Sequence, residues 1–179
     1  MRRLIAVSEG PDFVCYRYRL AAFSPAFEAA GWRLELMTLP HGATGFARML
    51  KALATADAVV IQRRLFSGGK TWLIRRAVRT LLYDFDDAVH LRDSNSNRRA
   101  DDPVRWSRFC RTVRMADAAL AGSPQLLGHA VRAAPAARVH LVPTCVDPAR
   151  YASATHDRPA GAAEMVWIGS RSTSAALDD

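Results

Sequence analysis

Short apolar runs alternate with longer amphipathic segments along most of the chain. Apolar runs that end in polar or turn-forming residues are typical of strands buried on both faces of a parallel sheet. The pattern predicts strands at residues 4–8, 33–39, 58–62, 80–85, 118–121 and 139–142. It predicts helices at residues 15–30, 45–54, 71–78, 103–115 and 124–133.

Strands that alternate with helices specify a parallel sheet with right-handed crossovers. We therefore expect an α/β fold, a Rossmann-like doubly wound parallel sheet, for residues 1–150. Residues 151–163 are rich in Ala, Pro and Gly and are expected to form a linker. Residues 165–170 predict a seventh strand, which we interpret as the first strand of a truncated second domain at residues 164–179.

Several residues predict where the helices begin and end. Pro25 lies inside the segment 15–30 and is expected to kink that helix or to restart it with Ser24 as the N-cap. Gly31 is expected to end it. Asp102 and Ser123 each precede a proline and are expected to be N-caps.

Composition is that of a globular domain, with 50% hydrophobic and 23% charged residues. No apolar run approaches the ~20 residues that span a bilayer, and the first residues predict a strand rather than a signal peptide. The cysteines, Cys15, Cys110 and Cys145, are odd in number and form no CxxC motif. We therefore expect reduced thiols and a cytoplasmic protein.

The net charge of +8 comes from the front half of the chain. Residues 1–83 carry 13 basic and 5 acidic side chains, whereas residues 84–179 carry 12 of each. Of the 25 basic residues, 23 are arginines, which suit phosphate or carboxylate binding, although a GC-rich genome also favours Arg and Ala. The charge is compatible with an anionic membrane or a phosphorylated substrate. Without aromatic residues interleaved in a basic strand, nucleic acid is not expected.

Three carboxylates, Asp84, Asp86 and Asp87, follow the apolar run at 80–83. Ligands of open α/β sheets bind beyond the carboxyl ends of the strands. Because like charges repel, a cation or hydroxyl is expected to offset their cost. Asp84 and Asp86 could hold a divalent metal that bridges a diphosphate, the acids could bind another polar ligand, or Asp86 and Asp87 could be solvated.

Gly69, Lys70 and Thr71 imitate the end of a Walker A motif. That motif requires glycine where Arg64 stands, and this loop follows the third predicted strand rather than the first. An ordinary helix start is therefore favoured over nucleotide hydrolysis.

Arg17 and Arg19 lie near the start of the first helix, where the helix dipole favours anions. Being two residues apart, they cannot share one helix face. They either bind an anionic ligand beside the acidic strand end or belong to a solvated helix start.

Six stretches together resemble the N-terminal half of a glycosyltransferase of family 4, which has the GT-B fold. They are residues 15–19 (CYRYR), 58–63 (AVVIQR), 82–88 (LYDFDDA), 118–124 (AALAGSP), 142–151 (VPTCVDPARY) and 167–173 (WIGSRST). The DFDD strand end is similar to that of a bacterial subgroup. The chain departs from the family at Thr144 and Cys145, which replace Asn-Gly, and at Arg171, which replaces Pro. The family's Glu-x7-Glu element does not occur before Asp179.

The resemblance implies that the N-terminal domain binds an acceptor, that the C-terminal domain binds a nucleotide sugar, and that no metal or separate cofactor is needed. It implies Asp86 or Asp87 as the catalytic general base. The acceptor contacts that we expect are Glu9, Gly10, Arg17 and Arg19. The donor contacts that we expect, through backbone and hydroxyl groups, are Gly169, Ser170, Ser172 and Thr173.

The expected function is therefore the acceptor-binding half of a hexosyltransferase, inactive without the missing donor domain. The expected partners are a nucleotide sugar, a glycan or lipid-linked acceptor and, for the basic front half, the inner face of an anionic membrane. The alternative is a stand-alone Rossmann-like domain that docks on a membrane or on a separately encoded donor domain.

Overall fold

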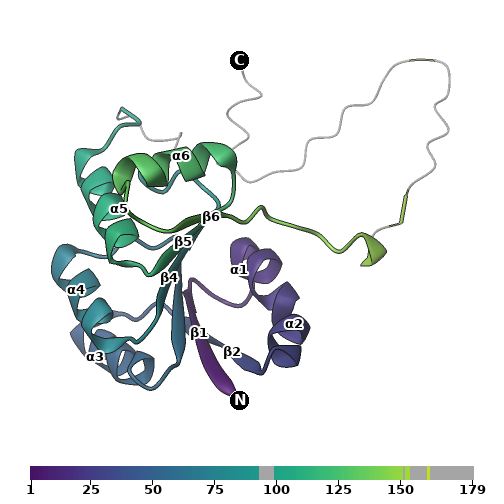
Figure 1. The fold of residues 1–179 in the computed structure, drawn as a ribbon, viewed down its shortest axis with the longest axis horizontal. Coiled ribbons are helices and arrows are strands. Elements are labelled where there is room, and N and C mark those ends of the chain that lie inside the picture. Colours follow the sequence, from purple (N-terminus) through teal and green to yellow (C-terminus); the bar gives the residue numbers. More distant parts are fainter. Residues whose placement is uncertain (93–98, 151, 154–160, 162–179) are drawn as a thin grey trace.

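The computed structural model describes residues 1–92, 99–150, 152, 153 and 161. Its centre is a six-stranded sheet with the order β2-β1-β3-β4-β5-β6, in which every neighbouring pair is parallel (Figure 1). The strands are β1 (Arg2–Ser8), β2 (Trp32–Thr38), β3 (Ala58–Gln62), β4 (Leu81–Phe85), β5 (Ala118–Ala121) and β6 (Val139–Leu141). The predicted α/β fold, a doubly wound parallel sheet, is confirmed.

Helices connect the strands on both faces of the sheet. They are α1 (Val14–Arg19), α2 (Ser24–Ala29), α3 (Gly42–Leu53), α4 (Gly68–Ala77), α5 (Pro103–Met115) and α6 (Pro124–Ala133). Two 3-10 turns complete the described elements, at Ala21–Phe23 and Pro148–Arg150.

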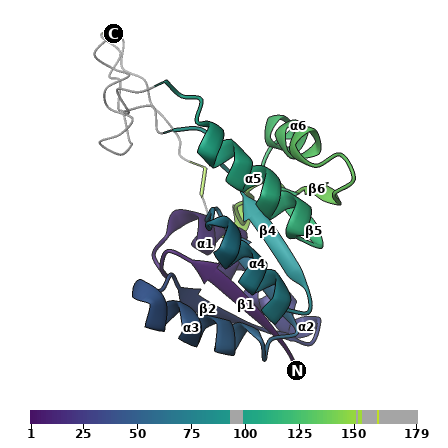
Figure 2. The same cartoon turned by 90° about the vertical axis from the view of Figure 1, so that its left-hand side faces the viewer.

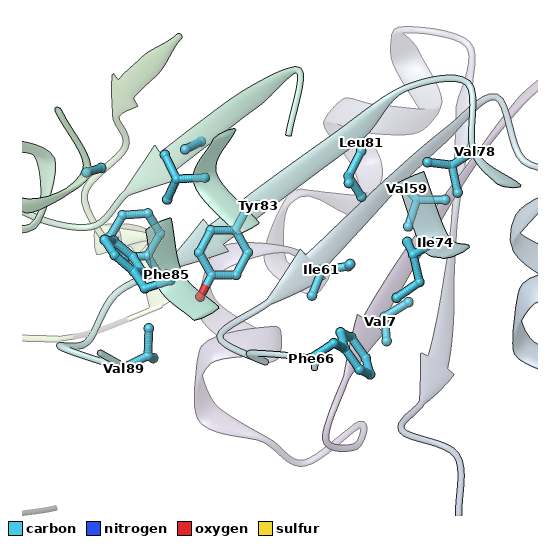
Figure 3. Packing of buried hydrophobic residues seen from close by; sticks show 14 of the residues in the cluster. Val7, Val59, Ile61, Phe66, Ile74, Val78, Leu81, Tyr83, Phe85 and Val89 are labelled. Atoms are coloured by element: carbon cyan, nitrogen blue, oxygen red, sulfur yellow. The ribbon is translucent and has the colours of Figure 1, made fainter. Parts of the chain in front are cut away.

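The larger hydrophobic core lies between the sheet and helices α3, α4, α5 and α6. Figure 2 looks onto this side of the molecule, with α3, α4 and α5 in front of the strands. Ile61, Leu81 and Tyr83 of the central strands point into the same layer as Ile74 of α4 (Figure 3). These residues are at most 2% exposed, so the predicted apolar runs do form strands covered by helices.

The opposite face carries a smaller core. Leu20, which directly follows α1, packs against Ala6 of β1 and Val60 of β3. Figure 1 shows α1 and α2 on this side of the sheet. Leu82 of β4 contributes to this cluster only as a partly buried residue, and Leu120 of β5 is also half-buried. Helix cover on this face is therefore concentrated over β1 and its neighbours.

The predicted helix at residues 15–30 is three separate pieces. A 3-10 turn ends before Ser24, and α2 restarts there, with Pro25 in its first turn. Ser24 is the first helical residue rather than the N-cap, which is Phe23. Gly31 ends this segment as predicted, at φ +77°, a left-handed conformation that glycine adopts without strain.

The other predicted N-caps are confirmed. The Asp102 side chain accepts hydrogen bonds from the backbone N–H groups of Val104 and Arg105, at the start of α5. Ser123 Oγ accepts one from Leu126 N–H at the start of α6. The expected linker and second domain at residues 151–179 lie almost entirely outside the described residues, as do the central residues of the connection between β4 and α5.

Candidate ligand site at the carboxyl edge of the sheet

The order of the strands reverses at the gap between β1 and β3. β2 lies on one side of β1, and β3 to β6 follow on the other. In open α/β sheets, ligands bind beyond the carboxyl ends of the strands at such a switch point. Glu9 and Gly10 follow β1 there, Arg63 follows β3, and Asp86 and Asp87 follow β4. The predicted carboxylates therefore sit one strand away from the switch point.

A buried chain of polar side chains underlies this edge. Ser8 Oγ donates to Gln62 Oε1 at 2.8 Å, and Gln62 Nε2 donates to Asp84 Oδ2 at 2.9 Å. Arg19 Nε donates to both carboxylate oxygens of Asp84, at 3.0 and 3.1 Å. All four side chains belong to residues that are at most 7% exposed. Asp84 is thus a structural anchor whose charge is balanced by Arg19.

Arg19 also holds the chain that follows β6. Its Nη1 donates to the carbonyl oxygen of Val142 at 2.7 Å and to Thr144 Oγ1 at 3.2 Å. Burial alone would lower the pKa of Arg19, but the hydrogen bonds and charge of Asp84 outweigh it and raise that pKa. Arg19 was predicted to contact an acceptor. The structure instead uses its guanidinium inside the protein, with a side chain only 2% exposed.

Arg63 provides the cation for the other two carboxylates. Its Nη2 donates to Asp87 Oδ2, and its Nε lies 3.6 Å from Asp86 Oδ1. The backbone of Arg63 has a φ of 58°, an uncommon value for a residue other than glycine. A hydrogen bond from its N–H to the carbonyl oxygen of Asp84, at 2.8 Å, helps to hold this conformation.

Asp86 and Asp87 differ in accessibility. The Asp87 side chain is 64% exposed, whereas that of Asp86 is 18% exposed. The backbone of Asp86 packs closely on Gly122, where an added Cβ would lie 2.7 Å from Asp86 Cα. Asp87 is therefore the carboxylate that a ligand can reach, and Asp86 is wedged between β4 and the end of β5.

Cys15 lies beside this pair and accepts a hydrogen bond from Arg63 Nη1 at 3.1 Å. Burial, together with the neighbouring Asp86 carboxylate, raises the pKa of the Cys15 thiol to about 11. The thiol is protonated at neutral pH, so it is poorly suited to act as a nucleophile.

The remaining predicted acceptor contacts are dispersed. Glu9 is exposed and faces the same concavity as Arg63. Arg17 is exposed on the opposite side of α1 from Arg19, with its guanidinium 5.7 Å from the centre of the Tyr18 ring. Gly10 is half-buried in the loop after β1. The predicted donor contacts, Gly169, Ser170, Ser172 and Thr173, lie outside the described residues.

Sequence reasoning missed a group of arginines at the switch point. A concavity of about 410 Å³ opens there, and four of its eight lining residues are arginines. The lining consists of Glu9, Phe13, Arg63, Arg64, Leu65, Val89, Arg105 and Arg108. A signal was present, since Arg63 and Arg64 directly follow a buried strand and Arg105 and Arg108 are one helical turn apart. We call this concavity the arginine pocket.

A larger concavity, of about 770 Å³, lies between α5 and α6 and is lined by His90, Trp106 and His129, among others. The ring of His90 packs against both of these side chains and against Phe109. Burial, together with the nearby charges of His129, Arg132 and Arg105, lowers the pKa of His90 to about 4. His90 is therefore neutral at physiological pH.

Two alternatives from the sequence find no support at this edge. Lys70, the lysine of the Walker-like stretch, lies over the ring of Phe46 at 5.1 Å, and Asp84 is engaged with Arg19. Within the described ranges, no three His, Cys, Asp or Glu side chains are grouped so that they could hold a metal ion. In the same ranges, no helix combines the length and the apolar character that crossing a bilayer requires.

Comparison with known proteins identifies similar structures only. No family model matches the chain, and no curated protein matches it. The structure of Anabaena HepE with UDP and glucose is 15% identical over 86% of this chain, with a TM-score of 0.47. The HepE complex with UDP-glucose gives the same values, and the complex with UDP is 16% identical over 82% of this chain, with a TM-score of 0.42. The chain spans 45–47% of the HepE chains, about half their length.

Proposed function

We propose that this chain is the acceptor-binding half of a glycosyltransferase that moves a hexose from a nucleotide sugar to a hydroxyl group. The observation that carries the proposal is the accessible Asp87 carboxylate, which Arg63 holds at the carboxyl edge of a doubly wound sheet. The resemblance of six stretches to family 4 glycosyltransferases supports the same assignment.

In the proposed reaction, the acceptor hydroxyl loses its proton to Asp87. The acceptor oxygen forms a bond to the anomeric carbon, the bond from that carbon to the diphosphate oxygen breaks, and the nucleoside diphosphate leaves. Arg63 orients Asp87 through its hydrogen bond to Oδ2. Asp86, which lies beside Arg63 and is largely covered, acts as a positioning residue for that guanidinium.

The donor would bind to a second domain that begins near residue 164. In this proposal, Gly169, Ser170, Ser172 and Thr173 donate hydrogen bonds to the diphosphate. Residues 1–179 by themselves would not catalyse transfer. The protein would work in the cytoplasm, with its basic front half at the inner face of the membrane.

The test compares residues 1–179 with the longest protein that contains this sequence in frame. Each is incubated with radiolabelled UDP-glucose, the ligand of HepE, and an extract of the source cells, and label in glycan and lipid products is counted. We expect transfer by the longer protein only. Asp87→Asn should lower its rate by about 100-fold or more, the scale of a lost general base.

The matched control is Glu28→Gln, which neutralises an exposed carboxylate on α2 and should leave the rate unchanged. Transfer at the full rate by residues 1–179, or by the Asp87→Asn protein, would contradict the proposal. Co-purification with a separate chain that restores transfer would instead favour the docking-domain alternative.

A further inference from the structure

We infer that the arginine pocket is a phosphate site, which binds a phosphoryl group of the acceptor. The pocket lies at the switch point of the sheet, where α/β folds place their ligands. Its walls come from the loops after β1, β3 and β4 and from one side of α5. That the phosphate belongs to the acceptor rests on the proposed function, whereas the phosphate site does not.

The charges of the pocket are not balanced within the protein. Among its arginines, Arg63 is paired with Asp86 and Asp87. In the described part of the chain, the guanidinium groups of Arg64 and Arg108 have no hydrogen-bonding or charged partner. Arg105 donates from Nε to the carbonyl oxygen of Val89 at 3.1 Å, which leaves its two terminal nitrogens for a ligand. The one carboxylate in the lining is Glu9.

Three guanidinium groups without a paired carboxylate repel one another around this concavity, and an anion between them removes that cost. A phosphoryl group fits better than a carboxylate. Guanidinium donors form planar forks that bind two oxygens at a time, and three forks exceed what the two oxygens of a carboxylate can accept. A phosphoryl group offers three terminal oxygens at once.

The pocket also has a place for the rest of the ligand. Phe13, Leu65 and Val89 supply apolar walls beside the arginines, and about 410 Å³ exceeds the space that a phosphate alone would fill. Arg63 lines the pocket and also binds Asp87. A ligand with its phosphate on Arg64 and Arg108 would therefore extend past Arg63 toward the proposed general base.

Calorimetric titration with inorganic pyrophosphate at low ionic strength tests the phosphate site in residues 1–179. The Arg64→Gln/Arg108→Gln double variant should bind at least about tenfold more weakly, because two charge-assisted contacts are lost. The control is Arg48→Gln/Arg79→Gln, which removes the same charge at exposed positions outside the pocket. It should bind within about twofold of the unchanged protein. Urea unfolding curves of both double variants check that they fold.

Equal weakening in the two double variants would overturn the inference, as would the absence of pyrophosphate binding or equally tight binding of acetate. Flotation with phosphatidylglycerol vesicles, and titration with glucose 1-phosphate, separate a lipid phosphate from a soluble one. Flotation that the pocket variant alone loses supports a lipid-linked source. Binding of glucose 1-phosphate without flotation supports a soluble one.

The inference and the proposed function fail separately. If pyrophosphate binds through Arg64 and Arg108 but the longer protein transfers no sugar, the phosphate site stands and the transferase proposal fails. If the longer protein transfers sugar and its KM for the acceptor is unchanged in Arg64→Gln/Arg108→Gln, the pocket inference fails and the transferase proposal stands.

Discussion

Arg19 and Asp84 form an ion pair in which each side chain is only 2% exposed. The pair joins the end of α1 to the middle of the sheet, and its remaining hydrogen-bonding capacity is used by Gln62 and by the backbone of Val142. A buried pair costs desolvation energy, and it is stable here because every charged group has several partners.

Removing one partner of this pair should be strongly destabilising. Asp84→Asn leaves the buried Arg19 guanidinium without a counter-charge, and we expect the free energy of unfolding to fall by about 3–5 kcal/mol. Urea unfolding followed by circular dichroism measures it. The apolar double variant Arg19→Met/Asp84→Leu should lose less than Asp84→Asn, because it leaves no buried charge.

The matched control is Glu35→Gln, which breaks a pair with Arg3 whose side chains are about one-third exposed. Solvent screens such pairs, so the loss should be much smaller. Equal losses for Asp84→Asn and Glu35→Gln would show that the Arg19–Asp84 pair is not a structural anchor.

Two glycines should respond oppositely to alanine. A Cβ on Gly122 would lie 2.7 Å from Asp86 Cα, so Gly122→Ala must displace the backbone beneath the carboxylates. We expect a loss of about 1–3 kcal/mol in the free energy of unfolding. Gly128 lies in α6 with nothing within 4 Å of its added Cβ, and Gly128→Ala should stabilise by up to about 1 kcal/mol. Thermal unfolding of both variants measures the difference, and a shift in the same direction would contradict the packing described here.

Two serines at helix N-caps provide another matched pair. Ser123 Oγ caps α6, so Ser123→Ala should cost about 1 kcal/mol of unfolding free energy. Ser67 precedes α4, but its side chain makes no capping hydrogen bond. The Ser67→Ala protein should therefore unfold at nearly the same urea concentration as the unchanged protein. A larger loss in Ser67→Ala than in Ser123→Ala would refute the assigned caps.

The lowered pKa of His90 predicts loss of stability on mild acidification. The unfolded chain, with a histidine pKa near 6.5, binds this proton more readily than the native state, in which the pKa is about 4. The contribution of His90 is therefore complete above about pH 6.5 and declines as the pH falls toward 4, by at most about 1.4 kcal/mol per pH unit.

Urea midpoints at about pH 7 and about pH 5 measure this decline. His90→Leu should flatten the pH dependence, whereas His41→Gln, at an exposed position, should keep it. Asp102, whose pKa is lowered by hydrogen bonds from Arg105 and Val104 N–H, loses its contribution at lower pH, below about 3.8. An unchanged pH dependence in His90→Leu would show that another group is responsible.

Much of the fold was predictable because buried parallel strands leave a simple signal. The runs at 58–62 and 118–121 are strands with the predicted bounds, and the helix at Pro103–Met115 also has its predicted bounds. The segment at 15–30 was harder, because the break before Ser24 depends on packing against the sheet as well as on Pro25.

The site was only partly predictable. The cationic offset expected for the carboxylates exists, as Arg19 for Asp84 and Arg63 for Asp86 and Asp87. Which arginine is buried could not be inferred, because that depends on how α1 lies against β4. The arginine pocket was missed because its residues come from four segments, which only the strand order brings together.

The hydrogen bonds from Arg19 to Val142 and Thr144 have a mechanical consequence. The chain leaves the sheet from a point that is tied, through a single guanidinium, to the carboxylate at the end of β4. Any hinge between this sheet and the later part of the chain must therefore turn beyond Thr144. A body swinging on that hinge would have its axis fixed relative to the arginine pocket, so that its approach to the pocket depends on the same buried charge pair.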